Sequence, residues 1–193
     1  MRIFLITPKD RRFNQRYLDA LKMCASSLKD FYRNEMGGKT FVLNNPIVDT
    51  LTGLHNADWY NADNGSSSGT MPRFYAFYNT LNEMKQLLGN DFNTNLYMNA
   101  VYVAAPGDGA GIPGFCAMGD QDLDGLLGIN PSDNRIGRWI GGSGHEWGHG
   151  FGLPHPTDPE EQSALMGFGY LEYPNTFLLP ADKAVLNGSM FFR

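Results

Sequence analysis

Three of the four histidines of this chain fall within residues 145–155, and a glutamate directly follows the first of them. His145 and His149 are four residues apart, so on a helix their side chains lie one turn apart on the same face. Two imidazoles in this arrangement can bind one zinc ion from the same side, with Glu146 beside the ion but not bound to it. The spacing therefore predicts a metal site with a carboxylate next to it.

A third ligand is available after the helix. Gly152 can adopt a positive φ, which would end the helix and turn the chain back, so that His155 reaches the same ion. Three protein ligands leave a fourth position for water, which is typical of catalytic zinc sites rather than structural ones. Such an ion lowers the pKa of its water, and Glu146 is placed to accept the proton and pass it to a leaving amine. We therefore expect hydrolysis of a peptide bond.

Residues 145–155 read HEWGHGFGLPH, which resembles HExxHxxGxxH, the zinc signature of the metzincin clan of metallopeptidases. Members of that clan also have a methionine-containing turn downstream, and Met166 in the segment SALMG is similar to that methionine. The resemblance implies an α+β, metzincin-like fold with a mixed twisted sheet, two long helices, an active-site helix and a small irregular C-terminal subdomain. It implies one catalytic domain over residues 1–193, with an upper subdomain of about 1–152 and a lower one of about 153–193.

The same resemblance implies roles for single residues. The ligands of one catalytic Zn²⁺ would be His145, His149 and His155. Glu146 would be the general base and acid. Some metzincins have a tyrosine two residues after the turn methionine, where it can approach the zinc. That position is Phe168 here, and the nearest candidates for an oxyanion or cleft-rim role are Tyr170 and Tyr173.

These residues favour a zinc-dependent endopeptidase acting on a protein or peptide substrate. Two alternatives stay open: a zinc hydrolase of a non-peptide amide or a cell-wall fragment, which would use the same groups, and a zinc-binding module without turnover. Glu146 argues against the last, because loss of that carboxylate is the simplest way to inactivate such a site. An extended substrate could add to an edge strand by backbone hydrogen bonds, and residues 111–118 are the candidates for that edge.

Hydrophobic periodicity predicts the elements that hold this site. Strands are expected at residues 2–7, 39–43, 47–51 and 96–105. Helices are expected at residues 14–36, 72–88, 135–151 and 180–187, the third of which carries the zinc motif. The order strand, helix, strand, helix, strand, edge, active-site helix agrees with the upper subdomain of a metzincin.

Length and composition limit the classes of protein to which this chain can belong. A chain of 193 residues is long enough for one domain with a sizeable core. A net charge of −5, with 18% charged residues, gives no electrostatic footprint for nucleic acid or for an anionic membrane. No apolar run approaches the ~20 residues needed to span a bilayer. The start of the chain is too short and too soon interrupted for a signal peptide. We expect a monomer and favour a secreted or extracytoplasmic location.

Two further patterns have ordinary explanations. Cys24 and Cys116 could form a disulfide, but no cysteine framework supports one, and two unpaired buried thiols are favoured. Residues 120–125 match the first half of a calcium-binding EF-hand loop. The twelfth position would be Pro131, which cannot supply the bidentate carboxylate, so an acidic surface turn is favoured over a Ca²⁺ site.

Overall fold

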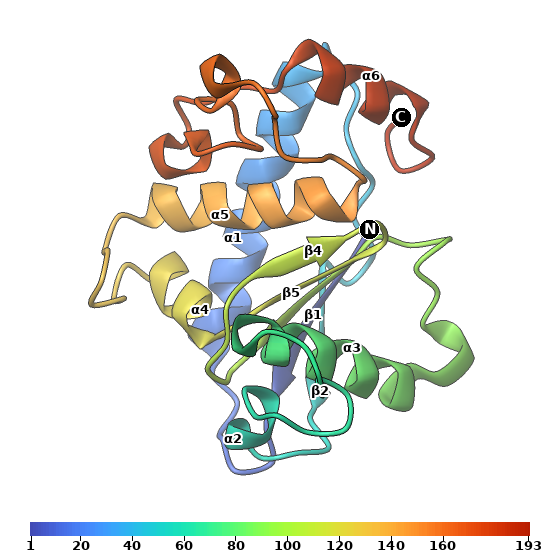
Figure 1. Ribbon diagram of the computed structural model, residues 1–193, viewed down its shortest axis with the longest axis vertical. Helices are drawn as coiled ribbons and strands as arrows, with labels where there is room; N and C mark the ends of the chain where they lie inside the picture. Colours follow the sequence, from blue (N-terminus) through green and yellow to red (C-terminus); the bar gives the residue numbers. More distant parts are fainter.

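A five-stranded sheet forms the centre of the computed structural model, which describes residues 1–193 (Figure 1). The strands are β1 (Arg2–Thr7), β2 (Val48–Thr52), β3 (Asn99–Val103), β4 (Ala110–Ile112) and β5 (Phe115–Met118). Their order in the sheet is β2-β1-β3-β5-β4. All neighbouring pairs are parallel except β4 and β5, so β4 is an antiparallel strand at one edge.

The chain has six α-helices: α1 (Gln15–Glu35), α2 (Ala57–Tyr60), α3 (Tyr75–Leu88), α4 (Asp120–Leu126), α5 (Ile136–Gly150) and α6 (Pro180–Gly188). Short 3₁₀ helices lie at Pro72–Phe74, Gly89–Asp91, Pro159–Glu161 and Gly169–Glu172. The side chain of Asn14 caps α1, because its Oδ1 accepts a hydrogen bond of 3.0 Å from the main-chain N–H of Arg16. The helices expected from the sequence are confirmed to within a few residues at most ends.

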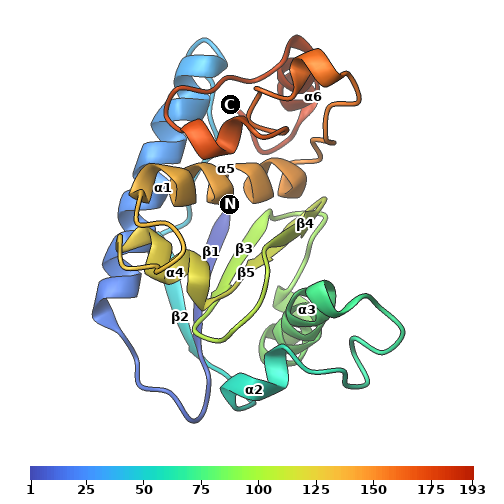
Figure 2. The same ribbon diagram turned by 60° about the vertical axis from the view of Figure 1, so that its left-hand side comes forward.

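The two faces of the sheet are both covered (Figure 2). Successive side chains of a strand point to opposite faces, so Ile3 and Leu5 pack with α1, α4 and α5, whereas Phe4 and Ile6 pack with α2 and α3. All four side chains are buried. The continuous apolar run at the start of the chain is therefore a strand that is buried on both faces of the sheet, as such runs are in parallel sheets.

The chain after α5 lies on the opposite side of that helix from the sheet (Figure 1). Apart from α6 and short 3₁₀ turns, this part has no regular structure. It is tied to α1: Glu35 accepts a hydrogen bond of 2.9 Å from the N–H of Leu178 and forms an ion pair of 3.0 Å with Lys183. Its apolar residues join the larger core cluster, which also contains the side chains of α1 and α5. The predicted α+β fold with a mixed twisted sheet, long helices and an irregular C-terminal part is confirmed.

The predicted strand at residues 39–43 is wrong. Only Phe41 pairs there, through an isolated antiparallel bridge with Phe192. Its ring is fully buried among the rings of Tyr32, Trp147 and Phe151, so the apolar residues of this segment fill the core instead of extending the sheet.

Two other predictions need correction. Within residues 111–118 only β4 forms an edge of the sheet, because β5 pairs with β3 on one side and with β4 on the other, which leaves residues 115–118 no free edge. Residues 120–125 are not a surface turn but most of α4, with Asp122 buried.

Cys24 and Cys116 are unpaired and buried, as expected. None of the helices has the combination of length and apolar character required to cross a membrane.

Candidate metal centre

Helix α5 carries the histidine motif between the sheet and the C-terminal part, and two glycines set how closely it packs. A Cβ atom at Gly148 would lie 2.2 Å from Sδ of Met166. At Gly144 it would lie 2.7 Å from Cδ2 of Leu28 in α1. The helix therefore approaches these two buried side chains so closely that a larger residue would force them to move. Met166, which the sequence pattern selects as the turn methionine, is fully buried directly against this helix.

The chain reverses direction at the end of α5. Gly152 has a φ of 98°, and the N–H of Leu153 donates a hydrogen bond of 2.9 Å to the carbonyl of Gly148. A residue with a left-handed backbone conformation at the end of the helix is what the sequence predicts. It brings His155 back to the side of the helix that carries His145 and His149.

The three imidazole rings meet at one point. Their Nε2 atoms are separated by 3.2 Å between His145 and His149, 3.1 Å between His145 and His155, and 2.9 Å between His149 and His155. The Nδ1 of His145 lies 2.9 Å from the carbonyl oxygen of Leu165, and that of His149 lies 2.8 Å from the carbonyl oxygen of Leu153. A carbonyl can only accept, so each Nδ1 donates and each opposite Nε2 holds a lone pair.

Lone pairs that face one another repel unless a cation lies between them. Nitrogen ligands of a tetrahedral zinc ion, at about 2.0–2.1 Å from the metal, are about 3.3 Å apart. The observed separations are close to this value, so the residues present fit a zinc ion. Burial lowers the pKa of His145 to about 4 and also lowers the pKa of His149, which keeps both rings in the neutral form that binds metals.

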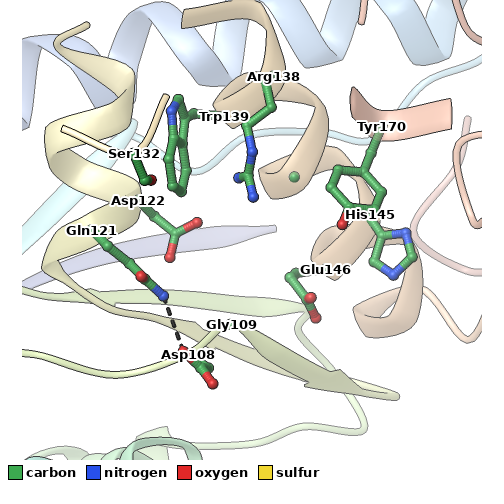
Figure 3. A pocket seen from close by; sticks show the side chains of 11 residues that line it. Asp108, Gly109, Gln121, Asp122, Ser132, Arg138, Trp139, His145, Glu146 and Tyr170 are labelled. Carbon is green, nitrogen blue, oxygen red and sulfur yellow. Dashed lines mark hydrogen bonds between the residues drawn. The ribbon is translucent and has the colours of Figure 1, made fainter. Parts of the chain in front are cut away.

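Glu146 points away from the helix into a recess beside the histidines (Figure 3). Its Oε2 atom is buried and has no hydrogen-bond partner. Burial, and secondarily the nearby charge of Asp122, raise the pKa of Glu146 to about 8. A divalent cation at the histidines would lower this pKa again, because it favours the ionised carboxylate.

The edge strand β4 passes close to this carboxylate. A Cβ atom at Gly109 would lie 3.3 Å from Cγ of Glu146, and one at Gly111 would lie 2.7 Å from both the carbonyl oxygen of Glu146 and Cβ of His149. The small residues next to and within β4 therefore allow its backbone to run directly beside the zinc motif.

The recess has a volume of about 260 Å³ and is lined mainly by polar groups (Figure 3). Its walls are Asp108, Gly109, Gln121, Asp122, Ser132, Arg138, Trp139, Gly142, His145, Glu146 and Tyr170. The guanidinium of Arg138 lies 3.8 Å from the ring centroid of Trp139 and 5.8 Å from that of Tyr170. Asp122 is 7% exposed, and its Oδ2 has no hydrogen-bond partner. These two side chains give the recess one cationic donor group and one carboxylate.

The two tyrosines singled out from the sequence lie in different places. The ring of Tyr170 is 5.0 Å from that of His145 and lines the recess. Tyr173 packs against Phe31, and its hydroxyl lies 2.7 Å from Oγ of Ser27 in α1, so it faces away from the recess.

Sequence reasoning missed Asp122 and Arg138. Arg138 stands seven residues before His145, two turns earlier on the same face of the helix, and that spacing was a usable signal. Asp122 carried no such signal, because its place in the recess depends on how α4 packs beside α5.

No protein-family model matches this chain, and no curated protein matches it in sequence. Solved structures do share its fold. A catalytically inactive OgpA from Akkermansia muciniphila, in complex with an O-glycopeptide (glycodrosocin) substrate, has a TM-score of 0.72 and 22% sequence identity, over 99% of this chain and 60% of that chain. Archaemetzincin from Methanopyrus kandleri has a TM-score of 0.50 and 14% identity, over 97% of this chain and 94% of that one.

A zinc-dependent peptidase from Methanocorpusculum labreanum is a weaker match, with a TM-score of 0.44 and 14% identity, over 95% of this chain and 98% of that chain. The first two likenesses show that the chain shares the fold of OgpA and of this archaemetzincin. The chain spans 60% of the length of OgpA.

Proposed function

We propose that this chain is a zinc-dependent endopeptidase of the metzincin clan. One Zn²⁺ would be held by the Nε2 atoms of His145, His149 and His155. The observation that carries the proposal is the convergence of these three atoms together with the donation of two Nδ1 protons to main-chain carbonyls. Three ligands from one side of the ion leave its other side open towards the recess.

The ion supplies the polarisation of a bound water and of the substrate carbonyl. Glu146 accepts the proton of the attacking water and returns it to the leaving amine; its buried, unpartnered Oε2 is available for this transfer. Tyr170, whose ring lies beside that of His145, would donate a hydrogen bond to the developing oxyanion. The substrate backbone pairs with the free edge of β4, which runs directly next to Glu146.

We propose further that residues 1–193 are one catalytic domain, with the part after residue 152 forming a lower subdomain, and that the protein acts as a secreted or extracytoplasmic monomer. The alternative of a zinc-binding module without turnover is less well supported, because Glu146 is present and faces the recess. A zinc hydrolase of a non-peptide amide or of a cell-wall fragment would use the same groups.

A second candidate substrate class is an O-glycopeptide. The OgpA structure contains such a substrate, and the recess beside Glu146 is suited to one. Sugar hydroxyls both donate and accept hydrogen bonds, and the recess offers a carboxylate without a partner on Asp122 and guanidinium donors on Arg138. An apolar side chain would leave these groups unsatisfied, which disfavours it.

The test combines metal content with cleavage. The purified protein should contain one zinc per chain and should cut either an unstructured protein such as casein or a synthetic O-glycopeptide. Glu146→Gln should keep the zinc and lower kcat/KM by about 10²–10⁴-fold, as expected for loss of a general base. Glu160→Gln, on the exposed turn after the motif, is the matched control. Cleavage that survives Glu146→Gln would exclude this residue as the base. If only the glycosylated form of an otherwise identical peptide is cut, the glycopeptide class is supported.

A further inference from the structure

A second, outer recess adjoins the one beside Glu146. It has a volume of about 490 Å³ and is lined by Asn61, Pro72, Arg73, Tyr75, Pro106, Gly107, Asp108, Asp120 and Gln121. Asp108 and Gln121 belong to the walls of both recesses. The Nε2 of Gln121 donates hydrogen bonds of 3.2 Å to Oδ1 of Asp108 and to the carbonyl of Gly107, so this pair forms the divide between them.

The two recesses are neighbours that share the walls formed by Asp108 and Gln121. The inner recess alone is smaller than the usual ligand site of about 300–1,000 Å³, whereas the outer one lies within that range. Both side chains of the divide are exposed. A substrate that extends beyond the inner recess on this side would therefore reach the outer one.

The charged groups around the outer recess differ in whether they have partners. Asp108 accepts a hydrogen bond from Gln121. Burial, and secondarily the charge of Asp124, raise the pKa of Asp120, and the charge of Arg11 only partly opposes this. The guanidinium of Arg73 lies 4.6 Å from the ring centroid of Phe74 and takes part in none of the four ion pairs of the structure. Arg73 is therefore a cation that lines the recess with no carboxylate bound to it.

We propose that the outer recess is a substrate subsite for a carboxylate-bearing group, held by Arg73. A guanidinium matches the planar carboxylate with two parallel N–H donors, which a lysine could not do. The carboxylate could belong to an Asp or Glu side chain of the peptide or to an acidic sugar attached to it; the chemistry at Arg73 is the same. This inference rests on the proposed peptidase function and adds a preference among its substrates.

The test measures a preference ratio. Peptides that differ only in Glu against Gln at positions flanking the cleaved bond, and glycopeptides that differ only in an acidic against a neutral sugar, are compared by kcat/KM. We expect one of the two acidic sets to be preferred about tenfold, mainly through KM, since the contact is present in the ground state. Which set it is identifies the source of the carboxylate.

Arg73→Ala should abolish that preference, and Arg73→Lys should restore it only partly. Lys85→Ala is the matched control, because it removes an exposed positive charge near the other end of α3 and should keep the full ratio. A preference that survives Arg73→Ala, or a parent protein without any preference, overturns the proposal.

Binding of the same fluorescently labelled pairs to the zinc-loaded Glu146→Gln protein, with and without Arg73→Ala, gives the ratio independently of turnover. A protein that binds the acidic form through Arg73 but never cleaves would refute the peptidase function and leave the subsite standing. Cleavage without a preference ratio that depends on Arg73 would refute the subsite and leave the peptidase function standing.

Discussion

His145 and His149 each give their Nδ1 proton to a main-chain carbonyl, and these two hydrogen bonds suit the cluster to metal binding. They fix the ring orientation and leave the Nε2 lone pairs directed at a common point. The carbonyl that receives the proton of His145 belongs to Leu165, next to Met166. The methionine turn and the motif helix are therefore joined by a hydrogen bond as well as by packing.

Asp122 provides a prediction about pH. Burial raises its pKa from 3.8 to about 7, and the charge of Arg138 only partly opposes this. Because the folded state holds this proton more tightly than the unfolded chain, the contribution of Asp122 to stability is complete below the unfolded pKa and is lost as the pH rises towards the folded value. Asp122→Asn removes the titrating group. We therefore expect the melting temperature of the variant, relative to the parent, to rise between about pH 4 and about pH 7, the interval between the unfolded and folded pKa values of Asp122.

Differential scanning calorimetry of the zinc-loaded proteins measures this difference. Asp19→Asn changes an exposed carboxylate of α1 and is the control. A difference between Asp122→Asn and the parent that stays constant over that pH interval would contradict the prediction.

Among the secondary-structure elements, α5 depends most on its glycines. Their number lowers the intrinsic stability of the helix, and their positions explain why they are there. Gly148→Ala places a Cβ against Sδ of Met166 and should destabilise the protein by about 1–3 kcal/mol. At Gly142 a Cβ would meet nothing closer than Nη1 of Arg138 at 3.6 Å, so Gly142→Ala should stabilise by about 0.4–1 kcal/mol.

Urea unfolding of the zinc-loaded variants gives both values. The two substitutions are expected to change the free energy of unfolding in opposite directions within one helix. A general gain in helix propensity cannot explain both results. If both variants stabilise the protein, the close packing of α5 on Met166 is not as described.

For the molecule as a whole, the metal ligands connect two parts of the chain. His145 and His149 lie on α5, whereas His155 belongs to the part beyond it that has little regular structure. A bound ion therefore stabilises the packing of that part as well as the helix. Removing zinc that is present at about 100 times its Kd should lower the melting temperature by about 5–10 °C. His155→Ala should weaken the site, and its melting temperature should respond much less to a chelator. A parent protein that melts at the same temperature with and without zinc would show that metal binding does not stabilise the packing of the C-terminal part against α5.

The motif helix, the first strand and the helices α1, α3 and α6 could be predicted because their signals are local. Apolar residues at helical spacing, a capping Asn14 and a terminating Gly152 act within a few residues of where they stand. The strand wrongly expected around Phe41 shows the limit of such signals. An apolar run states that a segment is buried, and only its neighbours decide whether its backbone pairs with a strand or its ring joins an aromatic cluster.

The order of residue types by itself thus predicted the metal chemistry, because the four positions proposed to carry it lie close together in the chain. The tertiary structure alone distinguished Tyr170 from Tyr173, buried Asp122 beside Glu146 and placed the two recesses on either side of Asp108 and Gln121. These features arise where α4 and the C-terminal part pack against α5, and where the segment before α3 lies beside the start of α4. Contacts between segments so far apart in the chain depend on how complete helices and strands pack together. No sequence pattern within a single element predicts such packing.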